Sequence, residues 1–409
     1  MRLPLGGIGE AFSDRNFRIY SLGSIVSWLS FFVQMVAVSW TAWQLTHSTT
    51  WLAIVALADI APNIVFVPLG GVLADRVDRF RIVVATHVLA LFQSLALTIL
   101  ASTDRLTIAP LVILAFLHGL IHSFSVPGLF GMMPRFVARE RLPSAIAVSS
   151  AYTQFAIFAG PALAGWIIVR YGVATAFATN VFGYFFYLCT IACLRTPADF
   201  RRPTPSGRSV LGDFVDGVRY IAGHRGISAL LLLMLLGDAM AASTIQMLPA
   251  YADKVLGMGV EGVSTLFGAA GFGATLAALW LAYGGAARAN PRRVLWAFLA
   301  FVLAIICLAL FASLIPAVLA MIAYGIAGEI RRTGTVSILQ MAVHDDQRGR
   351  VMSTQFLMQR IAGGVGVYLI GAAAEHNGLR LPMLIAAALA LVAWGVAFSQ
   401  RGRIAAAFE

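Results

Sequence analysis

The chain has 409 residues, of which 60% are hydrophobic and only 11% are charged. A soluble protein needs about a quarter of its residues charged, so this composition excludes an ordinary aqueous globule and predicts a protein that crosses the lipid bilayer many times. The net charge of +11 comes from basic residues dispersed among short loops, which excludes a nucleic-acid-binding arm or patch.

Twelve apolar runs follow one another along the chain, each of roughly the twenty residues that a membrane-spanning helix needs. A segment in lipid must satisfy its backbone hydrogen bonds internally, so we expect helices and an all-α membrane protein. The predicted spans are residues 18–45, 50–74, 82–102, 107–133, 143–169, 172–194, 227–253, 262–283, 294–313, 315–342, 351–374 and 381–399.

Arginine is concentrated in every second loop between these spans. The positive-inside rule therefore predicts that both termini lie in the cytoplasm and that the protein is a multi-pass protein of a bacterial-type cytoplasmic (inner) membrane. One long polar segment, residues 195–226, separates two predicted six-helix bundles at residues 1–194 and 227–409. We expect this segment to be a cytoplasmic linker that ends in a short surface helix.

The two halves also resemble each other in sequence. Residues 117–145 align without gaps to residues 323–351, and three glycines of the first half match three of the second at the same offset: Gly160 with Gly366, Gly165 with Gly371 and Gly172 with Gly378. A parallel repeat of two six-helix units is typical of alternating-access transporters, which bind substrate between the halves near the bilayer midplane.

The loop after the second span reads GVLADRVDRFR, a glycine followed by an acid and then by basic residues. It resembles the signature loop of the major facilitator superfamily, although Asp78 stands where a glycine is usual and Phe80 interrupts the basic pair. The resemblance implies the major facilitator fold, with twelve transmembrane helices in two pseudo-symmetric bundles. It also implies a gating loop formed by Gly71, Asp75, Arg76, Arg79 and Arg81.

The fifth span contains GPALAG, which resembles the antiporter motif of exporters in this superfamily. Gly160 and Gly165 thin the helix and Pro161 favours a bend, as a moving interface between helices requires, although small-residue packing alone explains the same motif. PRFVARERLPSAIA, LPAYADKVLGMGVEGVSTLFGAAGFGA and DDQRGRVMS together resemble the branch that includes enterobactin exporters and macrolide efflux proteins.

Charged side chains inside spans are candidate functional groups, because each costs about 2.5 to 3.5 kcal/mol at the bilayer centre. They are Asp59, Asp238, Glu329, Arg331, Arg332 and Arg360. The superfamily resemblance places Asp238 and Glu329 in the lining of the central cavity. Our hypothesis is that these two acids couple transport to protons, with Arg332 and Arg360 resetting them or holding an anionic part of the substrate. A static ion pair between helices is the alternative.

Asp59 lies four residues before Asn63 on one helix face, where it could be a third protonation site or a cap for backbone loosened by Pro62. His118 and His122 are also four residues apart. That spacing suits one metal ion, but no third ligand on the same helix completes a site, so we favour hydrogen bonding or proton relay. Gln34 and Gln246 add neutral hydrogen-bonding groups to the predicted substrate site.

No nucleotide-binding loop or catalytic motif occurs, so we expect neither an enzyme nor a cofactor. The predicted function is secondary active efflux of a small amphipathic or anionic organic compound, such as a siderophore or a drug, in exchange for protons, with sodium as the alternative coupling ion. Lysophospholipid transport, divalent-metal transport through the two histidines, and a transporter-like receptor without turnover remain alternatives. We expect a monomer surrounded by lipid, with no nucleic acid partner.

Overall fold

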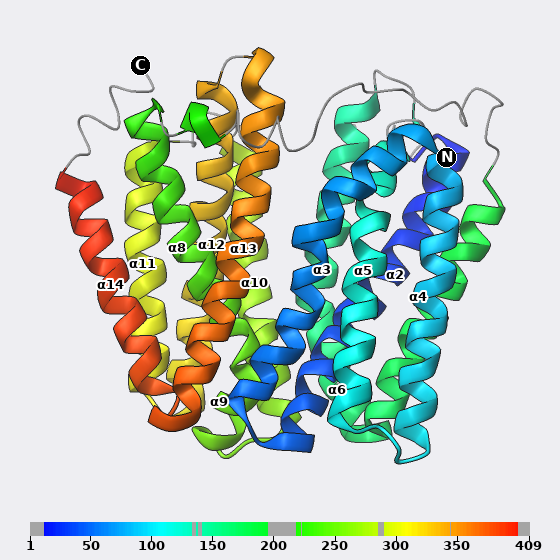
Figure 1. The fold of residues 1–409 in the computed structure, drawn as a ribbon, viewed down its shortest axis with the longest axis horizontal. Helices are drawn as coiled ribbons and strands as arrows, with labels where there is room; N and C mark the ends of the chain where they lie inside the picture. The colour runs from blue at the N-terminus through cyan, green and yellow to red at the C-terminus, as the bar shows by residue number, and fades with distance from the viewer. Residues whose placement is uncertain are drawn as a thin grey trace. The chain divides into compact units, whose positions relative to one another are not determined.

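The structure is a computed structural model that describes residues 12–132, 136–137, 141–194, 218–221, 223–284, 290–343 and 345–399. Helices dominate this part of the chain (Figure 1). In the N-terminal half they are α2 (Arg15–Thr46), α3 (Thr49–Arg76), α4 (Arg79–Ser102), α5 (Ile108–Met132) and α6 (Leu142–Ala192). The C-terminal half contributes α8 (Arg225–Gln246), α9 (Leu248–Lys254), α10 (Val260–Gly284), α11 (Pro291–Leu310), α12 (Leu314–Ala342), α13 (Asp345–Asn377) and α14 (Arg380–Ser399).

Eleven helices in the described residues are long and apolar enough to cross a membrane, which confirms the all-α membrane class. The difference from the twelve predicted spans lies in α6. This element has 51 residues, or roughly 75 Å of helix, and so has the length of two bilayer crossings. It contains the predicted spans 143–169 and 172–194, with non-helical backbone between them at Gly172 (φ 84°, ψ 169°).

The chain divides into two compact units. The first contains Met1–Leu45 and Ala58–Gly207, and the second contains Thr46–Leu57 and Arg208–Glu409. Helix α3 therefore contributes its first residues to the second unit and the rest to the first. Most of the predicted linker, residues 195–217, lies outside the described residues, while residues 218–221 and 223 are helical.

Close contact between helices in the first unit depends on glycine. A Cβ atom on Gly160 of α6 would lie 2.5 Å from Cβ of Phe32 in α2, so only glycine allows this approach. Pro161 and Gly165 beside it are buried. Pro161 lies inside helical backbone, and the residue with non-helical backbone in α6 is Gly172.

Facing glycines also join α10 and α12 in the second unit. A Cβ atom on Gly273 would collide with the backbone of Ile322, and one on Gly325 would collide with the backbone of Ala270. Two backbones that approach this closely gain dispersion contact along their length, as in other membrane helix pairs. The glycines in these spans thus set interhelical distance.

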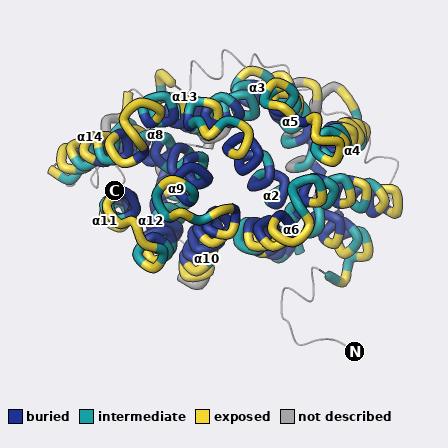
Figure 2. The backbone as a smooth tube through the Cα atoms, turned by 90° about the horizontal axis from the view of Figure 1, so that it is seen from below, coloured by how far each residue is buried: buried dark blue, intermediate teal, exposed yellow. Residues whose placement is uncertain are grey.

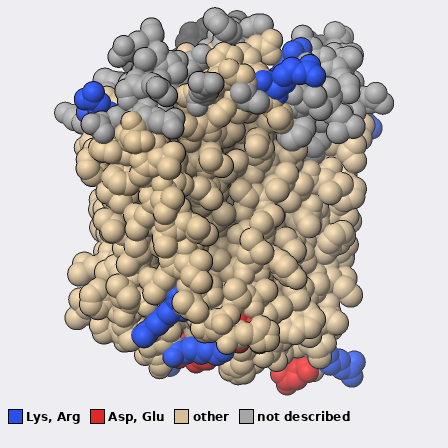
Figure 3. Space-filling view, turned by 60° about the vertical axis from the view of Figure 1, so that its left-hand side comes forward, with Lys and Arg blue, Asp and Glu red and all other residues tan. Residues whose placement is uncertain are grey.

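Apolar side chains cover the surfaces that face away from neighbouring helices. In Figure 2 exposed residues lie on the outward faces of the helices, and among them are large side chains such as Phe92, Trp166, Leu279 and Val392. The face seen in Figure 3 shows no charged residue over its middle, and Lys, Arg, Asp and Glu appear toward its two ends. An apolar belt between charged ends is the surface that a bilayer requires.

The break at Gly172 generates a stability prediction. Its dihedral angles lie in a region that is almost exclusive to glycine, so Gly172→Ala should cost roughly 1–3 kcal/mol and lower the melting temperature measured in detergent. Gly268→Ala is the matched control, because that glycine lies inside helix α10 with open space around its Cβ position. An unchanged melting temperature for Gly172→Ala would contradict the account of the break.

Candidate functional site

The carboxylates inside the spans each have a basic partner, and the partners differ in kind. Asp59 pairs with a histidine in the first unit, whereas Asp238 and Glu329 pair with arginines in the second. In sequence, Asp59 is the only Asp, Glu, Lys or Arg in the six predicted N-terminal spans, apart from Arg18 at the start of the first. Asp59 is therefore the acidic residue that the predicted N-terminal spans contain.

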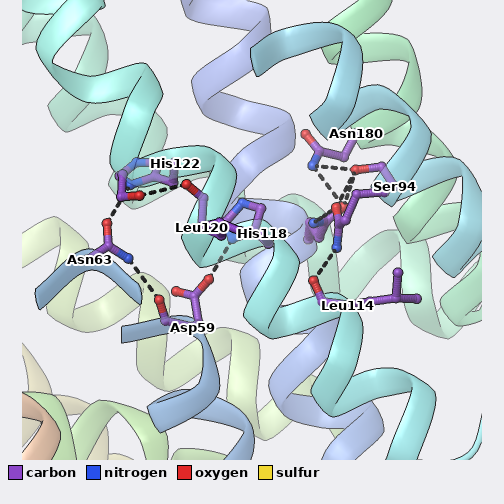
Figure 4. A network of polar contacts seen from close by, with 11 residues as sticks. Asp59, Asn63, Ser94, Leu114, His118, Leu120, His122 and Asn180 are labelled. Atoms are coloured by element: carbon purple, nitrogen blue, oxygen red, sulfur yellow. Dashed lines mark hydrogen bonds and ion pairs between the residues drawn. The ribbon is translucent and has the colours of Figure 1, made fainter. Parts of the chain in front are cut away.

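Asp59 and His118 form a short pair between α3 and α5, with 2.6 Å between Oδ1 and Nδ1 (Figure 4). The histidine side chain is 13% exposed and the carboxylate 43% exposed, so the pair is shielded on one side and open on the other. Gly119 allows this contact, because any Cβ there would collide with the backbone of Asp59. One turn along, Asn63 donates to the Asp59 carbonyl (2.8 Å) and lies 3.3 Å from the ring of His122.

The contact fixes which ring nitrogen of His118 carries the hydrogen. Its Nδ1 faces a carboxylate oxygen of Asp59, which can only accept when it is ionised, so Nδ1 donates. An aspartate and a histidine in direct contact are therefore a candidate site for proton exchange.

Aromatic rings cover the two imidazoles. Phe31 of α2 has its ring centroid 5.6 Å from that of His118 and 6.0 Å from that of His122, and the two imidazoles are 6.1 Å apart. Trp28 and Phe32 pack against the same phenylalanine. These apolar faces lower the local polarity and strengthen electrostatic interactions at the site.

A fully buried cluster of amides lies behind the pair. Asn180 and Ser94 each donate to Oε1 of Gln34 (2.8 Å for both), and Gln34 donates in turn to Gln93 (3.4 Å). Gln93 donates to the carbonyl of Leu114, which lies one turn before the first site histidine (3.1 Å). The cluster connects α2, α4, α5 and α6 through hydrogen bonds, and its bond to Leu114 holds the part of α5 that precedes His118. Of its members, sequence reasoning identified only Gln34.

Asp238 and Arg331 form a buried ion pair between α8 and α12. The Oδ1 to Nη2 distance is 2.7 Å, and the two side chains are 8% and 2% exposed. Arg331 also donates to the carbonyl of Met234 (3.0 Å) and lies over the ring of Phe301 (5.1 Å). Its guanidinium rests on Gly237, where a Cβ atom would come within 2.7 Å. Such an enclosed arginine holds the two helices in one register.

The second arginine pair is more open. Glu329 lies 2.7 Å from Arg332 one turn along α12, and Thr333 donates to its other oxygen at 2.5 Å. The glutamate side chain is 11% exposed and that of Arg332 is 49% exposed. Arg360 lies over the ring of Phe356 at 5.2 Å. Arg331, one of the charged candidates in the sequence, is thus the partner of Asp238. Gln246 ends α8.

The predicted gating loop is described only in part. Helix α3 runs through Gly71, Asp75 and Arg76, whose side chains lie outside the described part of the structure. Arg79 begins α4, and Arg81 lies 3.9 Å from Asp78. Asp78 accepts a hydrogen bond from the backbone N–H of Phe80 (2.9 Å) and so caps the helix, which explains an aspartate where the superfamily pattern has glycine.

Comparison with known proteins identifies efflux-related relatives. The family described as "Transmembrane secretion effector" matches residues 10–406. Macrolide efflux protein A of Streptococcus pyogenes is 24% identical over 226 residues, which are 55% of this chain and 56% of that protein. Enterobactin exporter EntS of Shigella boydii is 27% identical over 266 residues, 64% of this chain and 62% of the exporter. The chain thus spans a little over half the length of these relatives.

Solved structures of transporters share the fold. The peptide transporter POT superimposes with a TM-score of 0.77 at 13% identity and covers 97% of this chain, with 96% of POT matched. The nucleoside transporter NupG gives 0.73 at 14% identity, over 94% of this chain and 98% of NupG. These neighbours are membrane transporters rather than enzymes. The chain belongs to the transmembrane secretion effector family of the major facilitator superfamily.

Proposed function

We propose that this protein is a secondary active exporter that expels a small amphipathic or anionic organic compound, such as a siderophore or a drug, in exchange for protons. Relatives named for macrolide efflux and enterobactin export support both the direction and the class of cargo. The arginine-rich loops favour a topology with both termini in the cytoplasm, and the protein works as a monomer by alternating access.

The pair formed by Asp59 and His118 is the observation that carries the proton coupling. It is the acidic centre of the N-terminal spans, its members are 2.6 Å apart, and the aspartate is partly exposed. A proton that arrives from the outside converts the imidazole of His118 to an imidazolium, so that the pair with the Asp59 carboxylate has no net charge, and its loss to the cytoplasm restores the net charge of the pair to that of the carboxylate alone. Charged intramembrane groups of this kind serve as proton relays in pumps and transporters.

The arginine-paired acids suit other roles. Arginine stays protonated throughout the physiological pH range, so a carboxylate beside it already has the charge partner that stabilises its ionised form. The enclosed pair of Asp238 and Arg331 is a structural lock between α8 and α12. Arg332 is half exposed and can hold an anionic group of the substrate, with Glu329 as a second candidate for coupling. Arg360 supports the same anionic group.

The coupling proposal predicts the loss of proton movement in defined variants. Protein in liposomes with an internal pH dye is challenged with enterobactin, a macrolide, a lysophospholipid and a divalent metal under an imposed proton gradient. Wild type should show proton flux with the siderophore or the macrolide. Asp59→Asn and His118→Gln should fall to the background of protein-free liposomes, because neither variant retains an acid and a histidine in contact.

Asp104→Asn is the matched control for this experiment. It makes the same acid-to-amide change in an exposed turn, where the positive φ of 53° also suits asparagine. Its flux should equal that of wild type. Full flux in Asp59→Asn would refute coupling at this pair, and flux with metals alone would refute export of an organic compound.

The lock assigned to Asp238 predicts a stability effect. Removing one member of a buried ion pair costs about 3–5 kcal/mol, whereas replacing both with apolar groups costs far less. Asp238→Asn should therefore lower the melting temperature strongly, and Asp238→Leu with Arg331→Met should recover much of the loss. If Asp238→Asn keeps the melting temperature of wild type but loses proton-coupled flux, Asp238 is a coupling acid instead.

A further inference from the structure

Glu375, near the end of α13, holds the beginning of α3. One carboxylate oxygen, Oε2, accepts hydrogen bonds from the backbone N–H groups of Thr49 (2.8 Å) and Thr50 (3.2 Å). The same atom accepts from the hydroxyls of Thr49 and Ser48, both at 3.0 Å. The first N–H groups of a helix have no partner within the helix, and a carboxylate there also meets the positive end of the helix dipole. A residue more than three hundred positions away thus supplies the N-terminal cap of α3.

A backbone contact lies directly beside this cap. The hydroxyl of Thr49 also lies 2.8 Å from the carbonyl oxygen of Gly371, one turn before the glutamate, so its single hydrogen is shared between this oxygen and Glu375. A Cβ atom on Gly371 would lie 2.6 Å from Cβ of Ala53 and 2.9 Å from the carbonyl oxygen of Thr49. Ala53 and Thr49 are buried, with 0% and 1% exposure. The two helices therefore touch through backbone at this end, and glycine is what permits it.

This contact lies within the second unit, and α3 extends beyond it. Thr46–Leu57 belongs to the second unit, and Ala58 begins the part of the helix that belongs to the first. The next residue is Asp59, which pairs with His118 and packs on Gly119. Helix α3 is thus held near its start by Glu375 and in its middle by the proposed proton site.

The hydrogen bonds of this cap can break at a small cost in free energy. Glu375 is exposed, so water can replace the protein donors around its carboxylate when the helices separate, and the free energy lost is small. A buried carboxylate in the same position would carry a full desolvation penalty. The nearby pair of His47 and Asp253 is long (3.8 Å) and exposed, and contributes little to the contact.

We propose that Glu375 is a latch that keeps α3 against α13 on the exterior side of the membrane and releases it when that side opens. The assignment to the exterior follows from the arginine distribution. The proposal rests on the proposed function only in that it assumes alternating access. The four hydrogen bonds to Glu375 and the backbone contact at Gly371 break together, and their loss frees the start of α3 from α13.

Hydrogen–deuterium exchange on the full-length protein in lipid nanodiscs tests the latch without substrate or proton gradient. In Glu375→Ala, exchange in residues 46–57 should be about tenfold faster than in wild type, because loss of a helix cap shifts the local opening equilibrium by that order. Exchange in residues 226–234 and 336–342, at the opposite helix ends, should become slower, because opening one side of an alternating-access protein closes the other. Gly371→Ala leaves Glu375 intact but forces the backbones apart, and it should give the same two changes.

Glu261→Gln is the matched control, because Glu261 is an exposed acid in the first turn of α10 with no latch contact among the described residues. It should exchange like wild type at every segment. Faster exchange confined to residues 46–57 would identify Glu375 as a fixed cap and overturn the latch, and so would an unchanged pattern in Glu375→Ala and Gly371→Ala. The result does not depend on cargo or coupling ion, so it is separate from the flux experiments.

Discussion

The cost of charge in lipid is the constraint on which the rest of this structure depends. A chain that is mostly apolar can place an acid inside its spans only beside a group that compensates it. The partner then decides what the acid can do. A permanently charged arginine, as beside Asp238, gives a fixed contact between helices, whereas the histidine beside Asp59 completes the proposed proton site.

Glycine determines how closely the helices around these charges approach. Gly119 brings α5 onto the backbone of Asp59, and Gly237 makes room for the guanidinium of Arg331. Gly371 does the same for α3 and α13 at the proposed latch. Each of these three charged contacts is therefore paired with a position where no side chain fits, and polar geometry and backbone packing determine one another.

The apolar runs predicted the spans well, because bilayer thickness dictates their length. Two predicted spans lie in one element, α6, and the non-helical backbone of Gly172 marks the boundary between them. Charged candidates were also visible as isolated charges in apolar sequence. The partners of Asp59 and Asp238 could not be predicted. Asp59 and His118 are far apart in the chain, and Arg331 and Arg332 differ only in the face of α12 that each occupies. Helix rotation and packing decide such pairings, and sequence spacing alone does not fix them.

Proton release on binding tests the central claim most directly. Purified protein in a weakly buffered solution with a pH indicator is mixed with enterobactin or with a macrolide, and the released protons are counted for wild type and two variants. The account predicts release from wild type and from Glu329→Gln, and none from Asp59→Asn. Release that persists in Asp59→Asn and disappears in Glu329→Gln would place the coupling proton beside Arg332 and contradict the account.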